Sequence, residues 1–563
     1  MKLYDTLLDN VFWQRVRSDP AYADALSHIR AEYEEQAKAP LTVLPFTLRD
    51  RFYTDGDRSQ FEKYYFGRRV LLSSAAILAL VYPEKAAYLQ RVEDTLWAIC
   101  DEYSWAVPAH CTGDYADDTT MVDLFVAETG AAVAEITAML RERLHPRVFA
   151  RARVELKRRV FDNYRDRRFG WETVRTNWSA VCAGGIGIAM MYAAPELMEE
   201  FLPRLLASEQ CCMDSYTEDG ACLEGMSYWA YGFGYFVYFA DLLRRFTDGR
   251  IDLFADPKVK LMATFPQRNL MMGNTATSFA DGDMHAKVPL DLYHFLHRLY
   301  PDAVTLPPPE RMAFNEGNCR WVQFLRHFAY FDPALCGGEL PKVTYYLPVA
   351  GQYITTRDTF SFAVKAGRND EPHNHNDVGS FILSTAKGQE LCDLGAGLYT
   401  RQYFGSERYT IFCNSSLSHS VPIINGLLQH EGGEYGGSMQ TSGDTVTLEI
   451  GGAYPADVGS ITRTFVIGKK CVQLTDAWTD KVKSFTGRFV SVIEPTVTAG
   501  AVRFADCTLH FDPKAVTPKV SVEQHCMHGY KKDAEGKMPL LPVYCVDFAV
   551  DPAMGRVTFT FDM

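Results

Sequence analysis

The sequence has 563 residues, which is too long for a single ordinary hydrophobic core, so we expect two or more domains. Hydrophobic residues make up 47% and charged residues 23%, and this balance excludes a disordered or a fibrous protein. The formal net charge of −13, without a long run of Lys and Arg, argues against nucleic-acid binding, because phosphate neutralisation needs a basic surface.

The N-terminal stretch and the cysteines indicate the compartment. Residues 1–20 carry acidic side chains where a secretory signal needs an unbroken apolar stretch, so we expect a cytoplasmic protein. The 14 cysteines include no CxxC pair, which is typical of free thiols in a reducing compartment. The longest apolar run, 70–83, is too short to cross a bilayer and predicts a buried helix, so no membrane partner is expected.

The first part of the chain, up to about residue 335, has apolar residues at helical spacing. Short breaks that contain Pro or Gly separate the helices, which predicts antiparallel helical hairpins that close into a toroid or stack as a solenoid. A basic cluster at 151–168 is interpreted as a solvated helix face, with a surface for an anionic ligand as the alternative. The clearest helical stretches are 87–100, 121–144, 149–164 and 231–246.

The pattern changes after a linker at 301–311, which contains three consecutive prolines, and a short helical piece at 320–328. From residue 343 onward, alternating and β-branched runs dominate, and turn residues separate them roughly every 8–12 residues. This spacing predicts a β-sandwich. We therefore expect an α+β multidomain fold, with a helical domain at 1–340 and an antiparallel β-sandwich domain at 341–563.

Two histidines and an aspartate are concentrated in the segment 371–381, just before a predicted strand. His373 and His375 are two residues apart, so their side chains project to the same side of an extended chain and could serve one site. Asp393 and His419 follow on later segments. Two imidazoles and a carboxylate on neighbouring strands, with water in the fourth position, are chemically suited to zinc. The alternative is a hydrogen-bonded polar loop without a metal.

Two further polar groups lie in the helical half. Glu224 and Tyr228 are four residues apart at the start of a predicted helix, which places them on one face. A packing role is the alternative for Tyr228. Asn177 and Trp178 lead into an apolar helix that contains glycines, where Asn177 could act as a helix cap and nothing more.

Together these motifs resemble, in the same order, those of the heparinase II/III superfamily of polysaccharide lyases. The resemblance is carried by the Asn177-Trp178 pair, by EGMSYWAYG at 224–232, by HNHNDVGSF at 373–381, and by the later Asp393-Leu-Gly and Ser-His-Ser at 418–420. The similarity covers most of the chain. It implies an (α/α) toroid followed by a β-sandwich, and cleavage of uronate-containing glycans by β-elimination.

The resemblance also implies roles for individual residues. The implied ligands of one structural Zn²⁺ per chain are His375, Asp393 and His419. The implied catalytic residues are Tyr228, Asn177, His373 and Tyr409, with Tyr403 and Tyr399 as alternatives to Tyr409. Substrate contacts are expected from Trp178, Glu224, Trp229 and His110.

β-Elimination removes the proton at C5 of the uronate and expels the glycosidic oxygen at C4. Asn177 would contact the substrate carboxylate and His373 would point into the cleft, so that their N–H groups stabilise the charged intermediate. Tyr228 would be the acid/base, and its phenol needs a nearby positive charge to act as a base at neutral pH. Several family members carry a histidine base where this chain has Trp178. Either Tyr228 therefore makes both proton transfers, or His373 or a β-domain tyrosine shares the work.

We expect a lyase that acts on an acidic oligosaccharide or polysaccharide, with exo-action on short chains. Glycosaminoglycan fragments are the first choice of substrate and alginate-type oligouronates the second, and a homodimer is left open. A glycoside hydrolase on the same fold is an alternative, which needs two carboxylates such as Glu224 with Asp281 or Asp283. A uronate epimerase and a noncatalytic glycan-binding protein are the others. Only elimination creates a conjugated double bond that absorbs in the ultraviolet.

Overall fold

The structure is a computed structural model, and it describes residues 4–314, 320–528 and 537–563. The chain divides into two compact units, each built from three separate segments. The helical unit comprises Met1–Ser215, Ala230–Lys260 and Val288–Gly337, and the β unit comprises Tyr216–Trp229, Leu261–Lys287 and Gly338–Met563. The sequence places a single boundary between residues 340 and 341. In the structure, two short segments before this boundary, 216–229 and 261–287, belong to the β unit by their contacts. These segments carry several of the candidate site residues.

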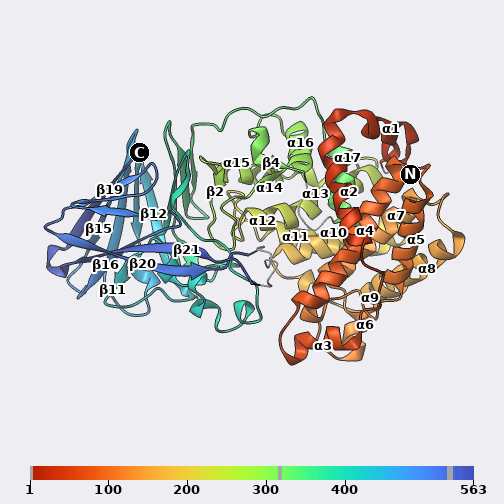
Figure 1. Cartoon of the computed structure of the whole chain (residues 1–563), viewed down its shortest axis with the longest axis horizontal. Helices are drawn as coiled ribbons and strands as arrows, with labels where there is room; N and C mark the ends of the chain where they lie inside the picture. Colours follow the sequence, from red (N-terminus) through yellow and green to blue (C-terminus); the bar gives the residue numbers. More distant parts are fainter. Residues whose placement is uncertain (1–3, 315–319, 529–536) are drawn as a thin grey trace. The chain divides into compact units, whose positions relative to one another are not determined.

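The helical unit consists of helices joined by short turns, as the apolar periodicity predicts (Figure 1). Its helices are α1 (Asn10–Ser18), α2 (Ala23–Ala37), α3 (Phe46–Thr54), α4 (Ser59–Val81), α5 (Ala86–Cys100), α6 (Tyr115–Thr120), α7 (Leu124–Met139), α8 (Pro146–Leu156), α9 (Asn163–Asp166), α10 (Asn177–Ala193), α11 (Met198–Met213), α13 (Gly234–Phe246), α16 (Leu290–Leu299) and α17 (Trp321–Tyr330). The first residues of α14 (Pro257–Ala263) also belong to it. A short parallel pair joins β3 (Val288–Pro289) to β4 (Met312–Ala313).

Helix α10 lies at the centre of this unit and packs against α7, α11 and α13. It is apolar on nearly all sides, which is typical of a helix that neighbours cover completely. Gly185 lets α7 approach closely, because a Cβ atom there would lie 2.9 Å from the carbonyl group of Ala127. The side chain of Thr176 caps the helix by accepting a hydrogen bond from the backbone N–H of Trp178. The cap is therefore Thr176, and Asn177 is instead the first helical residue.

Helix α4 is long and apolar enough to cross a membrane by length and composition. Of its most apolar 18-residue window, 78% is buried inside the structure, as in the core helix of a globular domain. The predicted buried helix at 70–83 corresponds to the second half of α4, in which every residue from Val70 to Val81 is buried. That prediction is confirmed.

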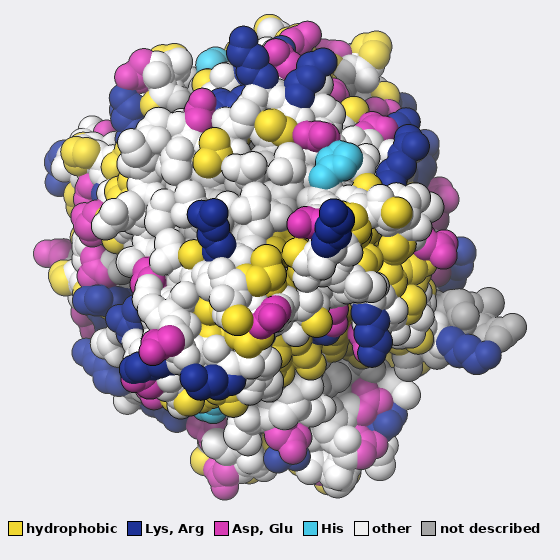
Figure 2. All heavy atoms as spheres, turned by 90° about the vertical axis from the view of Figure 1, so that its left-hand side faces the viewer, with side chains coloured by type: hydrophobic (Ala, Val, Ile, Leu, Met, Phe, Trp, Pro, Cys, Tyr) yellow, Lys and Arg dark blue, Asp and Glu magenta, His cyan; other side chains and the backbone are white. Residues whose placement is uncertain are grey.

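The charged surface is mixed in sign. Figure 2 shows one face of the molecule, on which Lys and Arg side chains are interspersed with Asp and Glu side chains. Among its described residues, this face carries no extended basic field of the kind that phosphate binding requires. The basic cluster at 151–168 forms ion pairs within the helical unit, such as Arg151 with Asp101 and Arg167 with Asp117.

Asp291 is a buried carboxyl in the first turn of α16. Its Oδ1 lies 4.0 Å from Nδ1 of His327, and its Oδ2 has no hydrogen-bond partner among the described residues. Burial raises the pKa of Asp291 from 3.8 to about 7. The same burial lowers the pKa of His327 to about 3, so that imidazole is neutral and does not compensate the carboxylate.

This environment gives a testable pH dependence of stability. The folded carboxyl binds its proton more tightly than the unfolded one, so its contribution favours folding below the unfolded pKa and is lost as the pH rises to about 7. A shift of this size corresponds to about 4 kcal/mol. Asp291→Asn is therefore expected to raise the free energy of unfolding at about pH 8 and to change it little at about pH 4. Denaturant unfolding at both pH values measures this, with the exposed Glu310→Gln as the control. Equal effects at the two pH values would contradict it.

The β unit contains three larger antiparallel sheets. A five-stranded sheet has the order β10 (Gly388–Leu391), β9 (Phe381–Thr385), β7 (Ser361–Lys365), β6 (Gln352–Thr356) and β5 (Thr344–Leu347). A four-stranded sheet has the order β11 (Ile423–Ile424), β16 (Phe485–Ser491), β21 (Leu541–Val550) and β20 (Val516–His525). A nine-stranded sheet has the order β17 (Thr496–Thr498), β18 (Ala501–Arg503), β19 (Thr508–His510), β22 (Arg556–Asp562), β15 (Cys471–Trp478), β14 (Ile461–Ile467), β13 (Thr445–Glu449), β12 (Gly432–Ser442) and β8 (Gly367–Asn369).

The three sheets share one hydrophobic core. Alternate residues of β14 are buried, as the sequence alternation predicts, and they face a cluster that includes Phe381, Phe489 and Phe561. Arg463 is the exception on this face. It is fully buried, and it pairs with Asp476 at 2.8 Å and donates to two backbone carbonyl groups. The chain is thus an α+β protein, with most of its helices in one unit and its three larger sheets in the other.

Short elements of the segments 216–229 and 261–287 complete the β unit. They are α12 (Met226–Tyr228), α15 (Phe265–Asn269), and the antiparallel pair β1 (Leu270–Met271) and β2 (Thr275–Ala276). This pair lies beside the five-stranded sheet, since the backbone N–H of Met272 donates to the hydroxyl group of Ser361 on β7 and the hydroxyl groups of Thr275 and of Ser384 on β9 are hydrogen-bonded. The loop after β2 and the loop between β8 and β9 carry the candidate site.

Candidate active site and metal centre

A single buried carboxylate, Asp281, organises the candidate site. It lies in the loop after β2, next to Ala280, whose backbone has a positive φ of 58°. The side chain of Asp281 is fully buried and accepts five hydrogen bonds. The donors are His373 Nδ1 at 2.7 Å, His375 Nε2 at 3.0 Å, Tyr399 Oη at 3.0 Å, Arg408 Nη2 at 3.1 Å, and the hydroxyl group of Tyr403. Burial alone would raise its pKa, but the hydrogen bonds from the two histidines hold the pKa of Asp281 well below its usual range.

His373 lies in the loop between β8 and β9 and adopts a left-handed backbone conformation with φ 58°. Nδ1 donates to Asp281, and Nε2 lies 3.7 Å from Oε2 of Glu224. Both histidines of the HNHND run do meet at one site, but the extended chain expected from their spacing is wrong. The turn at His373 brings its ring to one oxygen of Asp281, and the ring of His375 to the other. A non-glycine residue in this conformation is strained and needs surrounding contacts to hold it.

The ring of Tyr228 stacks on the ring of His373, with 4.2 Å between the centroids. Its hydroxyl group lies 2.8 Å from the hydroxyl group of Tyr399. Because Tyr399 donates its proton to Asp281, Tyr228 must be the donor in the bond between the two phenols. Burial, and then the charge of Asp281, raise the pKa of Tyr228 above its ordinary value. A phenolate would need a nearby positive charge. Here burial and the charge of Asp281 outweigh the pKa-lowering effect of Arg408, so the protonated phenol is the resting form.

Glu224 and Tyr228 both reach His373, but not from one helix face. Helix α12 begins only at Met226, and Gly225 before it has a φ of 96°, which a helix cannot contain. Glu224 therefore lies in the preceding turn, and the prediction of a shared helix face is wrong. Glu224 is buried and close to Nε2 of His373, which places it beside the same imidazole that Tyr228 covers.

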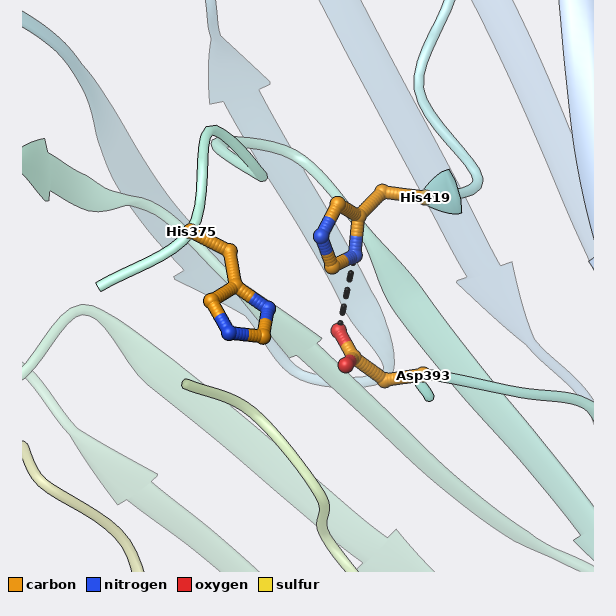
Figure 3. Close-up of side chains that lie close together, drawn as sticks. All are labelled: His375, Asp393 and His419. Carbon is orange, nitrogen blue, oxygen red and sulfur yellow. Dashed lines mark hydrogen bonds and ion pairs between the residues drawn. The ribbon is translucent and has the colours of Figure 1, made fainter. Parts of the chain in front are cut away.

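His375, Asp393 and His419 form the one group of three or more His, Cys, Asp or Glu residues, among those that the structure describes, whose ligand atoms converge as for a metal ion. These atoms lie within 4.8 Å of one another, and all three residues are fully buried (Figure 3). His375 comes from the loop between β8 and β9, Asp393 follows β10, and His419 follows the turn Ser416–Ser418. Nδ1 of His419 lies 3.0 Å from the carboxylate of Asp393.

The two histidines are oriented for zinc by the hydrogen bonds of the ring nitrogens that would not bind the metal. Nε2 of His375 bonds to Asp281 and Nε2 of His419 bonds to the carbonyl of Cys413, so each Nδ1 is left for a metal ion. Nδ1 of His375 is buried and has no hydrogen-bond partner among the described residues. Burial also lowers the pKa of His375, which favours the neutral imidazole that binds metals. Two imidazoles and one carboxylate form a common set of zinc ligands.

The candidate residues of the helical unit form their own group. Asn177 is buried at the first turn of α10, and Trp178 follows it. The ring of His110 contacts the ring of Trp178, with 4.7 Å between centroids, and stacks on Phe125. Nδ1 of His110 lies 2.7 Å from the buried carboxylate of Asp123, which fixes the imidazole. The structure therefore brings together three of the predicted residues, Asn177, Trp178 and His110.

Two predicted residues have other surroundings. Trp229 has no exposed surface, and its indole N–H donates to the carbonyl of Met262 at 2.8 Å, so it packs in the core and the predicted substrate contact is wrong. The hydroxyl group of Tyr409 donates to Oδ1 of Asn374 at 2.7 Å. Of the three tyrosines considered for the β unit, the one hydrogen-bonded to Tyr228 is Tyr399.

Two residues of the site, Asp281 and Arg408, are not predicted from the sequence in the roles that the structure indicates. From the sequence, Asp281 is expected only as one possible carboxylate of a hydrolase, and Asp281 lies 92 residues before His373 along the chain. The run Phe279-Ala-Asp-Gly-Asp283 resembles an ordinary surface turn, and no spacing rule connects it to the histidines. A usable signal is that this loop interrupts the helical pattern of the first part of the chain.

No protein-family model matches the sequence, and no curated protein sequence does. The fold is that of heparinase-like polysaccharide lyases. A solved heparinase III is similar, with 14% sequence identity, a TM-score of 0.62, and 90% of this chain and 79% of that chain covered. The heparan sulfate lyase HepC from Pedobacter heparinus is 11% or 12% identical in two structures, and in one of them the TM-score is 0.56 with 96% and 88% of the two chains covered. The chondroitin AC lyase of Streptomyces coelicolor A3 is 10% identical, with a TM-score of 0.54 over 99% and 82%. The resemblance inferred from the sequence is therefore confirmed for the fold.

Proposed function

We propose that the protein is a lyase that cleaves uronate-containing glycans by β-elimination and leaves a 4,5-unsaturated sugar at the new end. The observation that carries this proposal is the contact between a phenol and an imidazole, Tyr228 and His373, that are both tied to one buried carboxylate. An acid and a base held side by side are what the abstraction of one proton and the delivery of another require. The fold shared with heparinase III and chondroitin AC lyase supports the same reaction class. It also supports an (α/α) toroid for the helical unit and a β-sandwich for the β unit.

In this mechanism His373 is the base and Tyr228 is the acid. The N–H at Nδ1 of His373 is used by Asp281, so the lone pair on Nε2 is available for the C5 proton. The electron pair of the C5–H bond forms the C4–C5 double bond, and the C4–O bond breaks. Tyr228, whose raised pKa keeps it protonated, gives its proton to the departing oxygen. Asn177 would bind the uronate carboxylate and stabilise the negative charge that develops after proton loss.

A zinc ion held by His375, Asp393 and His419 would supply structural bracing rather than Lewis-acid chemistry, because its ligands and their hydrogen-bond partners are buried. This bracing would act on the loop between β8 and β9, which carries His375. His375 lies two residues after His373 in this loop. A metal ion bound to His375 would therefore also hold the backbone that positions the base, His373.

The alternatives are less well supported. A hydrolase needs one carboxyl group that is protonated at working pH. Asp281 cannot be this acid, because its pKa is lowered, and it cannot be the base beside Glu224, because its side chain is fully buried and its two oxygens already accept five hydrogen bonds. Asp283 is exposed, and its carboxylate accepts from the backbone of His285. We propose glycosaminoglycan-type oligosaccharides as the first substrate class, because the similar structures include a heparan sulfate lyase and a chondroitin AC lyase, and alginate-type oligouronates as the second.

The purified protein, incubated with hyaluronan, chondroitin, heparan and alginate oligosaccharides, tests this function. Elimination is expected to raise the ultraviolet absorbance in step with new reducing ends. New reducing ends without absorbance would indicate hydrolysis, and an unchanged chain length with an altered uronate would indicate an epimerase. Binding without any change of the glycan would indicate a noncatalytic protein.

Asn177→Ala is expected to lower kcat/KM by about 10²–10³, as the loss of one donor to an oxyanion does. Thr176→Ala is a matched variant, because it removes the cap of α10 and costs about 1 kcal/mol of stability without removing the amide. Thermal melting and steady-state rates of both variants separate the two effects. A rate loss in Thr176→Ala as large as in Asn177→Ala would show that Asn177 acts through the helix and not on the substrate.

A further inference from the structure

The two oxygens of Asp281 serve two different groups of residues. Oδ2 accepts from His373 Nδ1 and from Tyr399, which are the partners of the acid/base pair. Oδ1 accepts from His375 Nε2, Tyr403 and Arg408, and His375 is one of the candidate metal ligands. One carboxylate therefore spans the candidate metal centre and the candidate acid/base pair.

We propose that Asp281 is a positioning residue that couples the metal centre to the acid/base pair by fixing both histidine rings at once. It does not touch substrate, because its side chain is fully buried. By accepting from Nδ1 of His373, it selects the tautomer in which Nε2 is the free base. By accepting from Nε2 of His375, it selects the tautomer in which Nδ1 is free for the metal ion. The catalytic half of this inference rests on the proposed lyase function, and the metal half does not.

Arg408 extends the coupling to the backbone. Its guanidinium donates to Oδ1 of Asp281 and to the carbonyl groups of His373 and Asn374, each at 3.1 Å. These bonds tie the carboxylate to the loop whose residue His373 has a φ of 58°. A strained conformation persists only where its surroundings determine it, so loss of the carboxylate is expected to release the loop as well as the two rings.

An amide cannot replace this carboxylate. Asparagine has the same shape, but only one of its two terminal atoms accepts hydrogen bonds, and the other is an NH₂ group that would face two donors in the place of Oδ2 or three in the place of Oδ1. Asp281→Asn therefore leaves either the His373 side or the His375 side unsatisfied. The histidine on the unsatisfied side can then adopt the other tautomer. The protein loses the base if this histidine is His373, and a metal ligand if it is His375.

The test compares Asp281→Asn with Asp370→Asn, which removes an exposed carboxylate from the same loop between β8 and β9, where it pairs with Arg368 at 2.6 Å. Three quantities are measured: zinc affinity by chelator competition, the histidine tautomers of the zinc-free protein by ¹⁵N NMR, and kcat and KM on the preferred glycan. In Asp281→Asn, zinc affinity is expected to fall about 10–100-fold. We expect kcat to fall by up to about 10⁴, as when the aspartate of a His–Asp pair is replaced by asparagine, with little change in KM. Asp370→Asn is expected to match the wild type in all three.

The inference is overturned if Asp281→Asn keeps the wild-type zinc affinity and the wild-type tautomers of His373 and His375. If the wild type cleaves no uronate glycan, the proposed function fails, while the zinc affinity and the tautomers still decide the role of Asp281. If glycans are cleaved and Asp281→Asn leaves all three quantities unchanged, the function stands and the inference fails.

A second pair of variants serves if Asp281→Asn does not fold. Tyr399→Phe removes a donor to Oδ2, and Tyr403→Phe removes a donor to Oδ1. We expect Tyr399→Phe to lower kcat with little effect on zinc affinity, and Tyr403→Phe to lower zinc affinity by the larger factor. Identical effects of the two variants on both quantities would contradict a carboxylate with divided tasks.

Discussion

Replacing Tyr228 with Phe is expected to lower turnover of the preferred uronate glycan by about 10²–10⁴, which is the range for loss of a general acid. The substitution removes a single oxygen atom, and the ring can still stack on His373, where the centroids are 4.2 Å apart. Glycan affinity is therefore expected to stay close to that of the wild type. Ultraviolet absorbance measures the rate, and calorimetric titration of Tyr228→Phe with an uncleaved oligosaccharide measures the affinity.

The exposed Tyr346, on β5, provides the control, because Tyr346→Phe removes the same atom from a phenol outside the candidate site. Its rate should equal that of the wild type. A Tyr228→Phe variant that keeps more than about a tenth of the wild-type rate would contradict an acid role, since even the weaker general acids contribute more than this.

The pH dependence distinguishes an acid from a base at the same position. If Tyr228 were the base, the rate would rise as its phenol ionises, and burial together with the charge of Asp281 raises that pKa above the ordinary value near 10. If Tyr228 is the acid, the rate stays level up to about pH 9 and falls where the phenol loses its proton. A rate that increases steadily on the alkaline side would reassign the base from His373 to Tyr228.

Much of the fold could be predicted because it depends on local patterns. The spacing of apolar residues identified the long helices, and the alternation in segments such as Ile461–Ile467 identified the strands. The histidines and the aspartate of the candidate metal centre could be proposed together because family resemblance joined three residues that are far apart in sequence. The structure then brought His375, Asp393 and His419 within 4.8 Å of one another. Local periodicity and a shared motif order are both properties of the sequence itself.

The remaining features depend on tertiary contacts that no local pattern contains. Asp281 meets His373 across 92 residues, and Tyr399 meets Tyr228 across 171 residues. Glu224 was assigned to a helix face because the spacing of four fits a helix, but the φ of 96° at Gly225 delays the helix start. Trp229 was expected at a sugar, whereas its indole N–H finds a carbonyl in the core. Contacts between distant segments decided the outcome for Asp281, Tyr399 and Trp229, and the backbone conformation of one glycine decided it for Glu224.

Removal of the metal is expected to have the largest effect on stability. A ligand that binds only the folded state stabilises it by about 4 kcal/mol when its concentration is 1,000 times Kd. We therefore expect one zinc ion per chain in the purified protein, and a melting transition that falls by several degrees on addition of a chelator. His419→Ala removes a fully buried ligand and should lack zinc, melt at the temperature of the chelated wild type, and respond no further to chelator.

His430→Ala is the matched control, because this imidazole is exposed and contacts Glu431 and the ring of Tyr435. It should bind zinc and melt like the wild type. Because metal binding requires neutral imidazoles, zinc affinity is expected to fall as the pH is lowered, and the difference between His419→Ala and the wild type should shrink with it. Elemental analysis gives the zinc content, and calorimetry with and without chelator gives the stability. Full zinc occupancy in His419→Ala, or a wild-type transition that chelation does not move, would place the metal elsewhere or leave the three buried residues as a hydrogen-bonded cluster.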